Sequence, residues 1–161
     1  MARSYYSTVL NHTADEVWAV IRPFDHYAWA GVESDTVIEE GKRGDQVSAV
    51  RRVTMGERVI RQILLGHSDL DRAYTYAFFD PAALPVTNYV ATIRVLPVVD
   101  NDKAFVEWSA TFDCPADEHD RWTRYYEQEG FAKWLAALRC FMARDDADRD
   151  VRREAAANPV S

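Results

Sequence analysis

The sequence predicts an α+β fold in which a curved antiparallel β-sheet wraps around a long C-terminal α-helix, with two short helices near the N-terminus. Between residues 33 and 113 the hydrophobic period is two, and turn residues recur at fairly regular spacing, which is typical of a meander of antiparallel strands. From about residue 117 the apolar residues recur at spacings of three and four, which indicates one amphipathic helix. A helix start signal follows the first strand-like segment.

The bulk composition indicates one folded domain without a nucleic acid partner. The chain has 161 residues, of which 48% are hydrophobic and 12% aromatic, enough to bury a core. Its formal net charge of −7 disfavours nucleic acid, because phosphate binding needs a basic surface. No run resembles a signal peptide or a membrane span, so we expect a cytoplasmic protein without integral membrane association. We expect the domain to cover residues 1–144, and the charged tail at 145–161 to be frayed or disordered.

The cysteines and histidines predict neither a disulfide nor a metal site. Cys114 and Cys140 are too far apart for a CxxC motif and are expected to be reduced. The four histidines are scattered without a partner at metal-ligand spacing. There is also no phosphate-binding loop motif and no GxSxG motif. We therefore expect no metal and no cofactor.

The N-terminal segment predicts a strand followed by a capped helix. Residues 3–10 are rich in β-branched and aromatic side chains and predict the strand. Thr13 and Glu16 have the spacing of a capping box, and Val17, Trp18, Ile21 and Phe24 give the helix its apolar side. Residues 26–32 are expected to form a second short helix or a tight loop.

Turn positions give the strand registers. A two-residue turn at Gly56–Glu57, glycine first as type II′ prefers, sets Met55 opposite Arg58, Val53 opposite Ile60 and Arg51 opposite Gln62. A turn centred on Asp69 sets Gln62 opposite Tyr76 and Leu64 opposite Tyr74. A turn at Asp100–Asn101 predicts four further pairs: Val95 with Val106, Ile93 with Trp108, Ala91 with Ala110, and Tyr89 with Phe112.

These registers place the large apolar residues on one face of the sheet and polar residues such as Arg52, Arg61 and Glu107 on the other. A slip of one residue would exchange the two faces, so the register is well specified. The apolar face must be covered. We expect the cover to be a helix with Asp117 as its N-cap, running to about Arg144. Within it, Gly130 marks either a kink or a place where a guest molecule lies against the sheet.

Several short motifs, in this order and spacing, resemble a known superfamily. They are Thr13-Ala-Asp-Glu-Val-Trp18, Val50-Arg-Arg-Val53, Leu84-Pro-Val-Thr-Asn-Tyr89, Glu107-Trp-Ser-Ala-Thr-Phe112 and Trp134-Leu-Ala-Ala-Leu138. Over residues 3–144 the chain resembles the START and birch-pollen-allergen (SRPBCC) superfamily. That superfamily includes bacterial polyketide cyclase/dehydrase-type members and plant abscisic-acid receptors. The resemblance implies the helix-grip fold, which hosts carriers, receptors, cyclases and chaperone cofactors.

The resemblance also implies a cavity between the sheet and the long helix, entered past loop 81–86 and the Met55–Gly56 turn. Leu84 occupies the position of the receptors' latch leucine, but Ala82-Ala83 replaces the His-Arg that precedes it there. The hairpin loop reads Thr54-Met-Gly-Glu57 in place of the receptors' Ser-Gly-Leu-Pro gate, which argues against hormone-type signalling. Gln62 stands where related proteins often carry Glu, so a carboxylate general base is replaced by a neutral hydrogen-bonding group.

Polar groups on the predicted inner face provide the chemistry of the expected site. Arg51 either lies near the rim and reaches solvent, or anchors an anionic group of a ligand. Gln62 and the tyrosines 74, 76 and 89 would orient the guest within a largely apolar pocket. The predicted ligand-binding set is Arg51, Val53, Met55, Ile60, Gln62, Leu64, Tyr74, Tyr76, Phe78, Leu84, Tyr89, Ala91, Ile93, Trp108, Ala110, Phe112, Tyr126, Gly130 and Trp134.

No set of nucleophile, base and orienting group can be assembled from the sequence, so we predict no catalytic residue. The leading hypothesis is a carrier or sensor that binds a small apolar or aromatic molecule without covalent chemistry. The first alternative is a polyketide cyclase, aromatase or dehydratase, in which Arg51 would stabilise an enolate and a tyrosine would donate a proton. The second is a protein-interaction or co-chaperone-like module whose protein partner the sequence does not identify.

Overall fold

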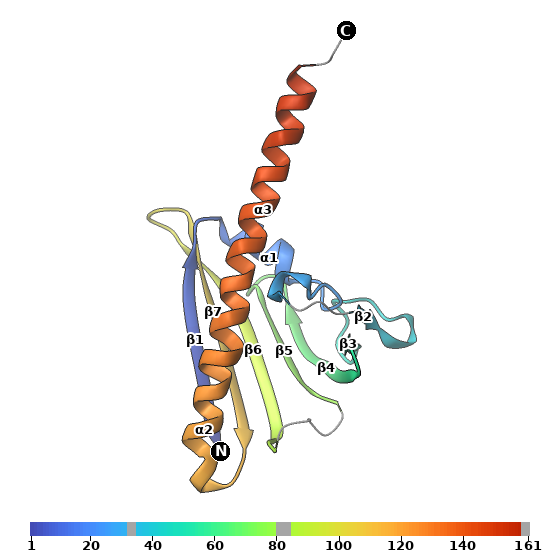
Figure 1. The fold of residues 1–161 in the computed structure, drawn as a ribbon, viewed down its shortest axis with the longest axis vertical. Coiled ribbons are helices and arrows are strands. Elements are labelled where there is room, and N and C mark those ends of the chain that lie inside the picture. The colour runs from blue at the N-terminus through green and yellow to red at the C-terminus, as the bar shows by residue number, and fades with distance from the viewer. Residues whose placement is uncertain (32–34, 80–84, 159–161) are drawn as a thin grey trace.

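The computed structural model describes residues 1–31, 35–79 and 85–158 (Figure 1). Its centre is a seven-stranded antiparallel sheet with strand order β1-β7-β6-β5-β4-β3-β2. The strands are β1 Ala2–Leu10, β2 Asp35–Ile38, β3 Val50–Met55, β4 Arg58–Ser68, β5 Ala73–Phe78, β6 Thr87–Val98 and β7 Lys103–Asp113. Together with the long C-terminal helix, this sheet confirms the predicted helix-grip fold.

The helical elements lie over one face of the sheet and at one end of it, except for the 3₁₀ turn at Glu39–Gly41, which directly follows the edge strand β2. They are α1 Ala14–Ile21, the short 3₁₀ turns η1 Ala28–Ala30, η2 Glu39–Gly41 and η3 Ala116–Glu118, then α2 His119–Arg124, the π-helical segment η4 Tyr125–Phe131, and α3 Ala132–Ala157. Figure 1 shows the continuous run from α2 to α3 crossing the sheet and then projecting beyond it. Within the described residues, none of the helices is long and apolar enough to span a membrane.

The start of α1 confirms the predicted capping box. The Thr13 hydroxyl accepts a hydrogen bond from the Glu16 backbone N–H at 3.2 Å, and the Glu16 carboxylate accepts one from the Thr13 N–H at 2.9 Å. Val17, Trp18 and Ile21 are buried, as is Phe24 just beyond the helix. The apolar side of α1 therefore closes the end of the core.

The register between β3 and β4 is confirmed at all three predicted pairs. Met55 pairs with Arg58, Val53 with Ile60 and Arg51 with Gln62. Gly56 has a φ of 61°, the positive value that the first central residue of a type II′ turn requires. The hairpin thereby fixes Arg51 and Gln62 as direct cross-strand neighbours.

The predicted register between β4 and β5 is wrong by two residues. Gln62 pairs with Phe78, and Leu64 pairs with Tyr76. The reason is that the connecting turn has four residues, 69–72, and that a bulge lies between Leu64 and Gly66. A shift of two residues keeps every side chain on its predicted face, so the inner face is unchanged.

Between β6 and β7, three of the four predicted pairs are confirmed: Val95 with Val106, Ile93 with Trp108, and Ala91 with Ala110. The predicted ladder pair of Tyr89 with Phe112 is wrong, because the register shifts at a bulge between Thr87 and Val90. The two rings nevertheless remain stacked, with centroids 6.4 Å apart.

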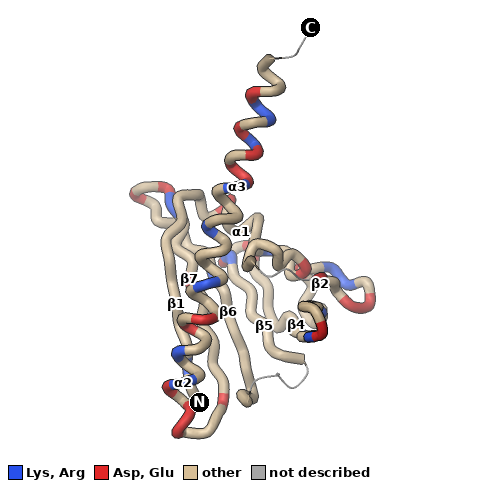
Figure 2. The backbone as a smooth tube through the Cα atoms, viewed as in Figure 1, with Lys and Arg blue, Asp and Glu red and all other residues tan. Residues whose placement is uncertain are grey.

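The C-terminal helix differs from the prediction at both ends. Asp117 is not an N-cap, because a 3₁₀ turn at Ala116–Glu118 leads into α2 without a side-chain cap. At the other end α3 continues to Ala157, past Arg144, where the sequence predicted the helix to end. The expected fraying of residues 145–161 stays a prediction. Figure 2 shows acidic and basic positions mixed along this projecting part. Arg149 and Asp145, one turn apart, form an ion pair of 2.7 Å of the kind that supports exposed helices.

Gly31 is the C-cap residue of η1, and η1 packs against α3. Its φ is 72°, and a Cβ added there would lie 2.9 Å from the Ala137 Cβ on α3. We expect Gly31→Ala to lower the free energy of unfolding by about 2–4 kcal/mol, through left-handed strain together with the clash. Urea denaturation measures the loss.

Gly56→Ala is the matched control for this prediction. Gly56 also has a positive φ, but nothing lies within 4 Å of its added Cβ. Gly56→Ala should therefore lower the free energy of unfolding by the backbone strain alone, about 1–2 kcal/mol. Equal losses in the two variants would mean that η1 does not press on α3.

Asp69, in the β4–β5 turn, ties the sheet to α1. Its carboxylate accepts hydrogen bonds from the Trp18 indole at 2.8 Å and from Arg22 Nε and Nη2 at 2.9 and 3.0 Å. Hydrogen bonding from Arg22, followed by that from Trp18, lowers the pKa of Asp69 to about 2. In the folded protein the carboxylate is therefore held in its charged form.

This shift predicts a pH dependence of stability. Because the folded pKa lies below the unfolded value of about 3.9, the contribution of Asp69 is complete above about pH 5 and fades as the pH falls toward 2. The stability difference between the wild type and Asp69→Asn should shrink over that range in denaturation at stepwise pH. Asp100→Asn, an exposed change in the β6–β7 turn, serves as the control. A difference that stays constant down to pH 2 would contradict the role of Asp69.

Candidate functional site

The inner face of the sheet forms an aromatic and aliphatic wall beneath the C-terminal helix. Most of the predicted set is buried there: Arg51, Val53, Gln62, Leu64, Tyr74, Tyr76, Tyr89, Ala91, Ile93, Trp108, Ala110, Phe112 and Tyr126, with Gly130 on the helix. Met55, Ile60, Phe78 and Trp134 are partly exposed. Leu84 lies outside the described residues. The structure thus places the described members of the set on one interior surface.

Arg51 lies on β3, next to the edge strand β2, and is 0% exposed, so it does not reach solvent at the rim. Its Nε donates to Gln62 Oε1 at 3.0 Å, and its Nη2 donates to the same oxygen. Its Nη1 donates to the Phe24 backbone carbonyl at 3.2 Å. All of these acceptors are neutral.

Aromatic rings surround the Arg51 guanidinium. Its Cζ lies 4.1 Å from the Phe24 ring centroid, 4.3 Å from that of Tyr27 and 5.4 Å from that of Tyr76. Within the described part of the chain, no carboxylate forms an ion pair with Arg51. The guanidinium is a buried positive charge that carbonyl dipoles and ring faces stabilise, with no counter-ion among the described residues.

Four tyrosines of the interior have raised pKa values. Burial raises the pKa of Tyr27 to about 12, although the Arg51 charge opposes the rise. Burial also raises the pKa of Tyr74, and it raises those of Tyr76 and Tyr89 well above the usual value. These phenols therefore stay protonated at neutral pH and can donate hydrogen bonds.

Three buried donors in the same interior have no hydrogen-bond partner within the described residues. They are the indole N–H groups of Trp29 and Trp108 and the hydroxyl of Tyr126. The two indoles are fully buried and their ring centroids lie 5.8 Å apart. A buried donor without a partner costs about 1–3 kcal/mol, so a polar acceptor between these elements would be stabilised.

The sequence did not identify Phe24, Tyr27 or Trp29 as site residues. Phe24 was assigned only to the apolar side of the first helix, and the other two lie in a short irregular segment. The segment around the three-residue 3₁₀ turn η1 is too short for a hydrophobic period, so no sequence pattern could have placed Tyr27 over Arg51 or Trp29 against Trp108.

Gly130 lies in the π-helical segment of the C-terminal helix. A Cβ added there would lie 3.3 Å from the ring of Trp134, so the protein's own ring occupies the space beside the glycine. The sequence predicted a kink or room for a guest at this residue, whereas the structure has a π-helical turn there, a feature that is frequent at functional sites.

Within residues 1–31, 35–79 and 85–158, no group of three or more His, Cys, Asp or Glu side chains is placed to hold a metal ion. The polar groups that converge on the interior are instead one cation, one amide, and phenol and indole donors. Such a set can orient an anion or a carbonyl oxygen inside an apolar enclosure.

Comparisons with known proteins agree with this architecture. A family model described as "Polyketide cyclase / dehydrase and lipid transport" matches residues 1–144. A search of curated proteins finds no match.

Solved structures share the fold. A protein from Thermobifida fusca is 28% identical with a TM-score of 0.75, covering 86% of this chain and 91% of its own. The protein XoxI from Bacillus cereus is 28% identical with a TM-score of 0.72, covering 86% and 94%. Norcoclaurine synthase from Thalictrum flavum, solved with dopamine and hydroxybenzaldehyde, is 16% identical with a TM-score of 0.69. The match covers 88% of this chain and 86% of the synthase, and at this identity it shows a shared fold only. The chain belongs to the polyketide cyclase/dehydrase and lipid transport family.

Proposed function

We propose that this protein is a cytoplasmic carrier or sensor that binds a small apolar or aromatic molecule between its sheet and its C-terminal helix. The observation that carries the proposal is Arg51, a buried guanidinium with neutral hydrogen-bond partners and no counter-ion among the described residues. A guest with a carboxylate, enolate or phenolate would supply the missing negative charge. Arginine suits this role because its fork of donors matches such groups.

The surrounding side chains provide the rest of the binding energy. The rings of Phe24, Tyr76 and Tyr89 desolvate the apolar body of the guest, at about 25 cal/mol per Å² of buried apolar surface before ordering costs. The unpaired indoles of Trp29 and Trp108 would donate to an oxygen further along the guest. Met55, at the β3–β4 turn, and Leu84 are proposed as part of the lid.

The second candidate function is a cyclase, aromatase or dehydratase, and the position of Tyr76 beside Arg51 favours it. Burial raises the pKa of the Tyr76 phenol, but the Arg51 Cζ lies 5.4 Å from the Tyr76 ring centroid, and this positive charge favours proton loss. In such an enzyme Arg51 would stabilise an enolate while a phenol donates the proton. Turnover of poly-β-keto substrates, followed by mass spectrometry, separates this function from simple binding.

Native mass spectrometry of the protein purified from the cells that produce it tests the proposal. We expect a fraction of the protein to carry a small organic molecule that denaturation releases. If the protein is empty and a panel of aromatic and fatty carboxylates changes neither its mass nor its melting temperature, the proposal fails.

A further inference from the structure

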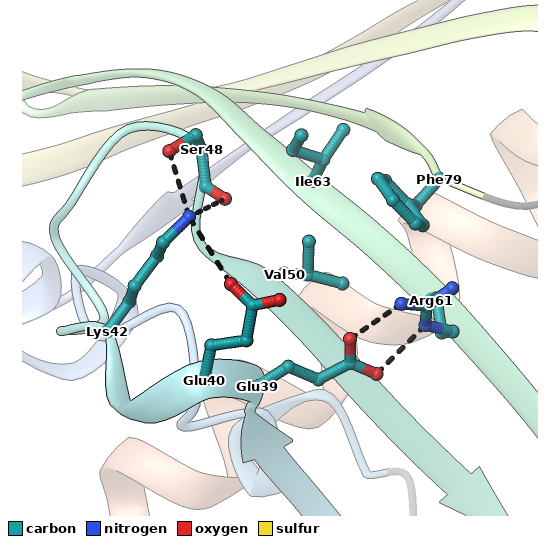
Figure 3. A pocket seen from close by; sticks show the side chains of 8 residues that line it. All are labelled: Glu39, Glu40, Lys42, Ser48, Val50, Arg61, Ile63 and Phe79. Atoms are coloured by element: carbon teal, nitrogen blue, oxygen red, sulfur yellow. Dashed lines mark hydrogen bonds and ion pairs between the residues drawn. The ribbon is translucent and has the colours of Figure 1, made fainter.

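A pocket of about 230 Å³ lies on the opposite, outer face of the sheet, away from the interior surface described above (Figure 3). Its floor is the cross-strand pair Val50 and Ile63, which alternate with the inward-facing Arg51 and Gln62 along β3 and β4. Phe79, just after β5, forms a wall and is 47% exposed. The pocket is smaller than the roughly 300–1,000 Å³ of drug-sized sites, so it fits a small molecule.

One basic side chain at this pocket already has a strong counter-ion. Arg61 forms a two-pronged ion pair with Glu39, with its Nε 2.8 Å from Oε1 and its Nη2 2.6 Å from Oε2. The guanidinium also lies over the Phe79 ring, with its Cζ 4.4 Å from the centroid. Arg61 and Glu39 therefore neutralise each other and form a flat wall beside the apolar floor.

The other basic side chain, Lys42, is held in place but incompletely paired. Its ammonium donates to the Ser48 backbone carbonyl and to the Ser48 hydroxyl, both at 3.3 Å. An ammonium has three donors, and the Glu40 carboxylate, with which Lys42 forms an ion pair, lies 4.0 Å away, beyond hydrogen-bond distance. Glu40 is 80% exposed, so this carboxylate is weakly held and can be displaced.

We propose that this outer pocket binds a small carboxylate with an aromatic or aliphatic body. The carboxylate replaces that of Glu40 on Lys42, and the body lies on Val50, Ile63 and Phe79. The anchored ammonium favours an anionic ligand over a cationic one, because its geometry is fixed in advance and the Glu40 carboxylate that competes for it is exposed to solvent. The site is separate from the interior one and does not depend on the function proposed there.

Titration of ¹⁵N-labelled protein with phenylacetate, followed by two-dimensional NMR, tests this site. We expect the backbone signals of Val50, Ile63 and Phe79 to shift, and to shift equally in the Arg51→Met variant, in which binding at the interior site is weakened. Lys42→Gln should weaken binding on the order of tenfold, because a hydrogen bond to a charged group is lost. Glu40→Gln should strengthen binding by removing the competing carboxylate.

Controls make the outcome decisive. Lys133→Gln removes an exposed lysine on α3 that does not line the pocket, so it should leave the affinity for phenylacetate unchanged. Phenylacetamide, the neutral counterpart of the probe, should bind more weakly than phenylacetate. The proposal is overturned if phenylacetate does not bind at millimolar concentration, or if its shifts are confined to the interior indoles. It is also overturned if phenylacetamide binds as tightly as phenylacetate, or if phenylethylammonium binds more tightly.

Discussion

Replacing Trp108 with alanine is expected to lower the free energy of unfolding by about 3–5 kcal/mol. The side chain is fully buried on β7, and its ring lies 5.8 Å from that of Trp29, 5.1 Å from that of Phe131 and 5.2 Å from that of Trp134. These rings come from η1, η4 and α3, so the alanine variant would leave a cavity where the helical elements meet the sheet. Chemical denaturation followed by circular dichroism measures the loss.

Two control variants identify the cause of this loss. Trp108→Phe keeps an aromatic ring and removes an indole N–H that has no partner among the described residues, so it should lose much less stability than the alanine variant. Val59→Ala alters a side chain that is 56% exposed and should change stability by less than about 0.5 kcal/mol. If Trp108→Ala remained within 1 kcal/mol of the wild type, the interior would be loosely packed around this ring.

Replacing Arg51 with methionine is expected to weaken binding of an acidic ligand by about tenfold to a hundredfold, the loss of hydrogen bonds to a charged group. The change removes a buried charge but leaves Gln62 Oε1 and the Phe24 carbonyl without their donor. These two effects oppose each other, so the stability of the free protein should change by less than about 2 kcal/mol. Isothermal titration calorimetry with an identified ligand and denaturation of the empty protein measure the two quantities separately.

Arg52→Met is the matched control, because Arg52 is the next residue on β3 and faces the outer side of the sheet. It removes the same charge and nearly the same volume without touching the interior, so the affinity should stay at the wild-type value. If both variants bind equally well, Arg51 is only a structural residue. If only Arg51→Met loses affinity while remaining folded, the anchor role is supported.

The sequence predicted those parts of the fold that local rules determine. A two-residue turn leaves only one register for its hairpin, which is why the Arg51–Gln62 pair could be derived from Gly56–Glu57. The β4–β5 register could not be derived from the sequence, because neither the four-residue turn nor the bulge after Leu64 has a distinct sequence signal. The error was an even number of residues, so the alternation of apolar and polar side chains still assigned the inner face correctly.

The candidate site was predictable from the strands but not from the loops. Every described strand residue in the predicted set lies on the inner face, since the strand period reports which side a residue faces. The rings of Tyr27 and Trp29 reach Arg51 and Trp108 through tertiary packing of a segment without any period. The π-helical segment at Tyr125–Phe131 could not be predicted from the sequence either. One extra residue in a helical turn leaves the spacing of the apolar residues nearly unchanged.

The projecting end of α3 gives this single helix two kinds of dynamic behaviour. Up to Met142 its buried side chains belong to the core, whereas every residue from 146 to 158 is exposed. Amide hydrogens of the first part can exchange with solvent only when the molecule opens as a whole. Those of the outer turns depend on local helix–coil equilibrium, which relaxes in about a microsecond, so they should exchange early and be the first place where proteases cut.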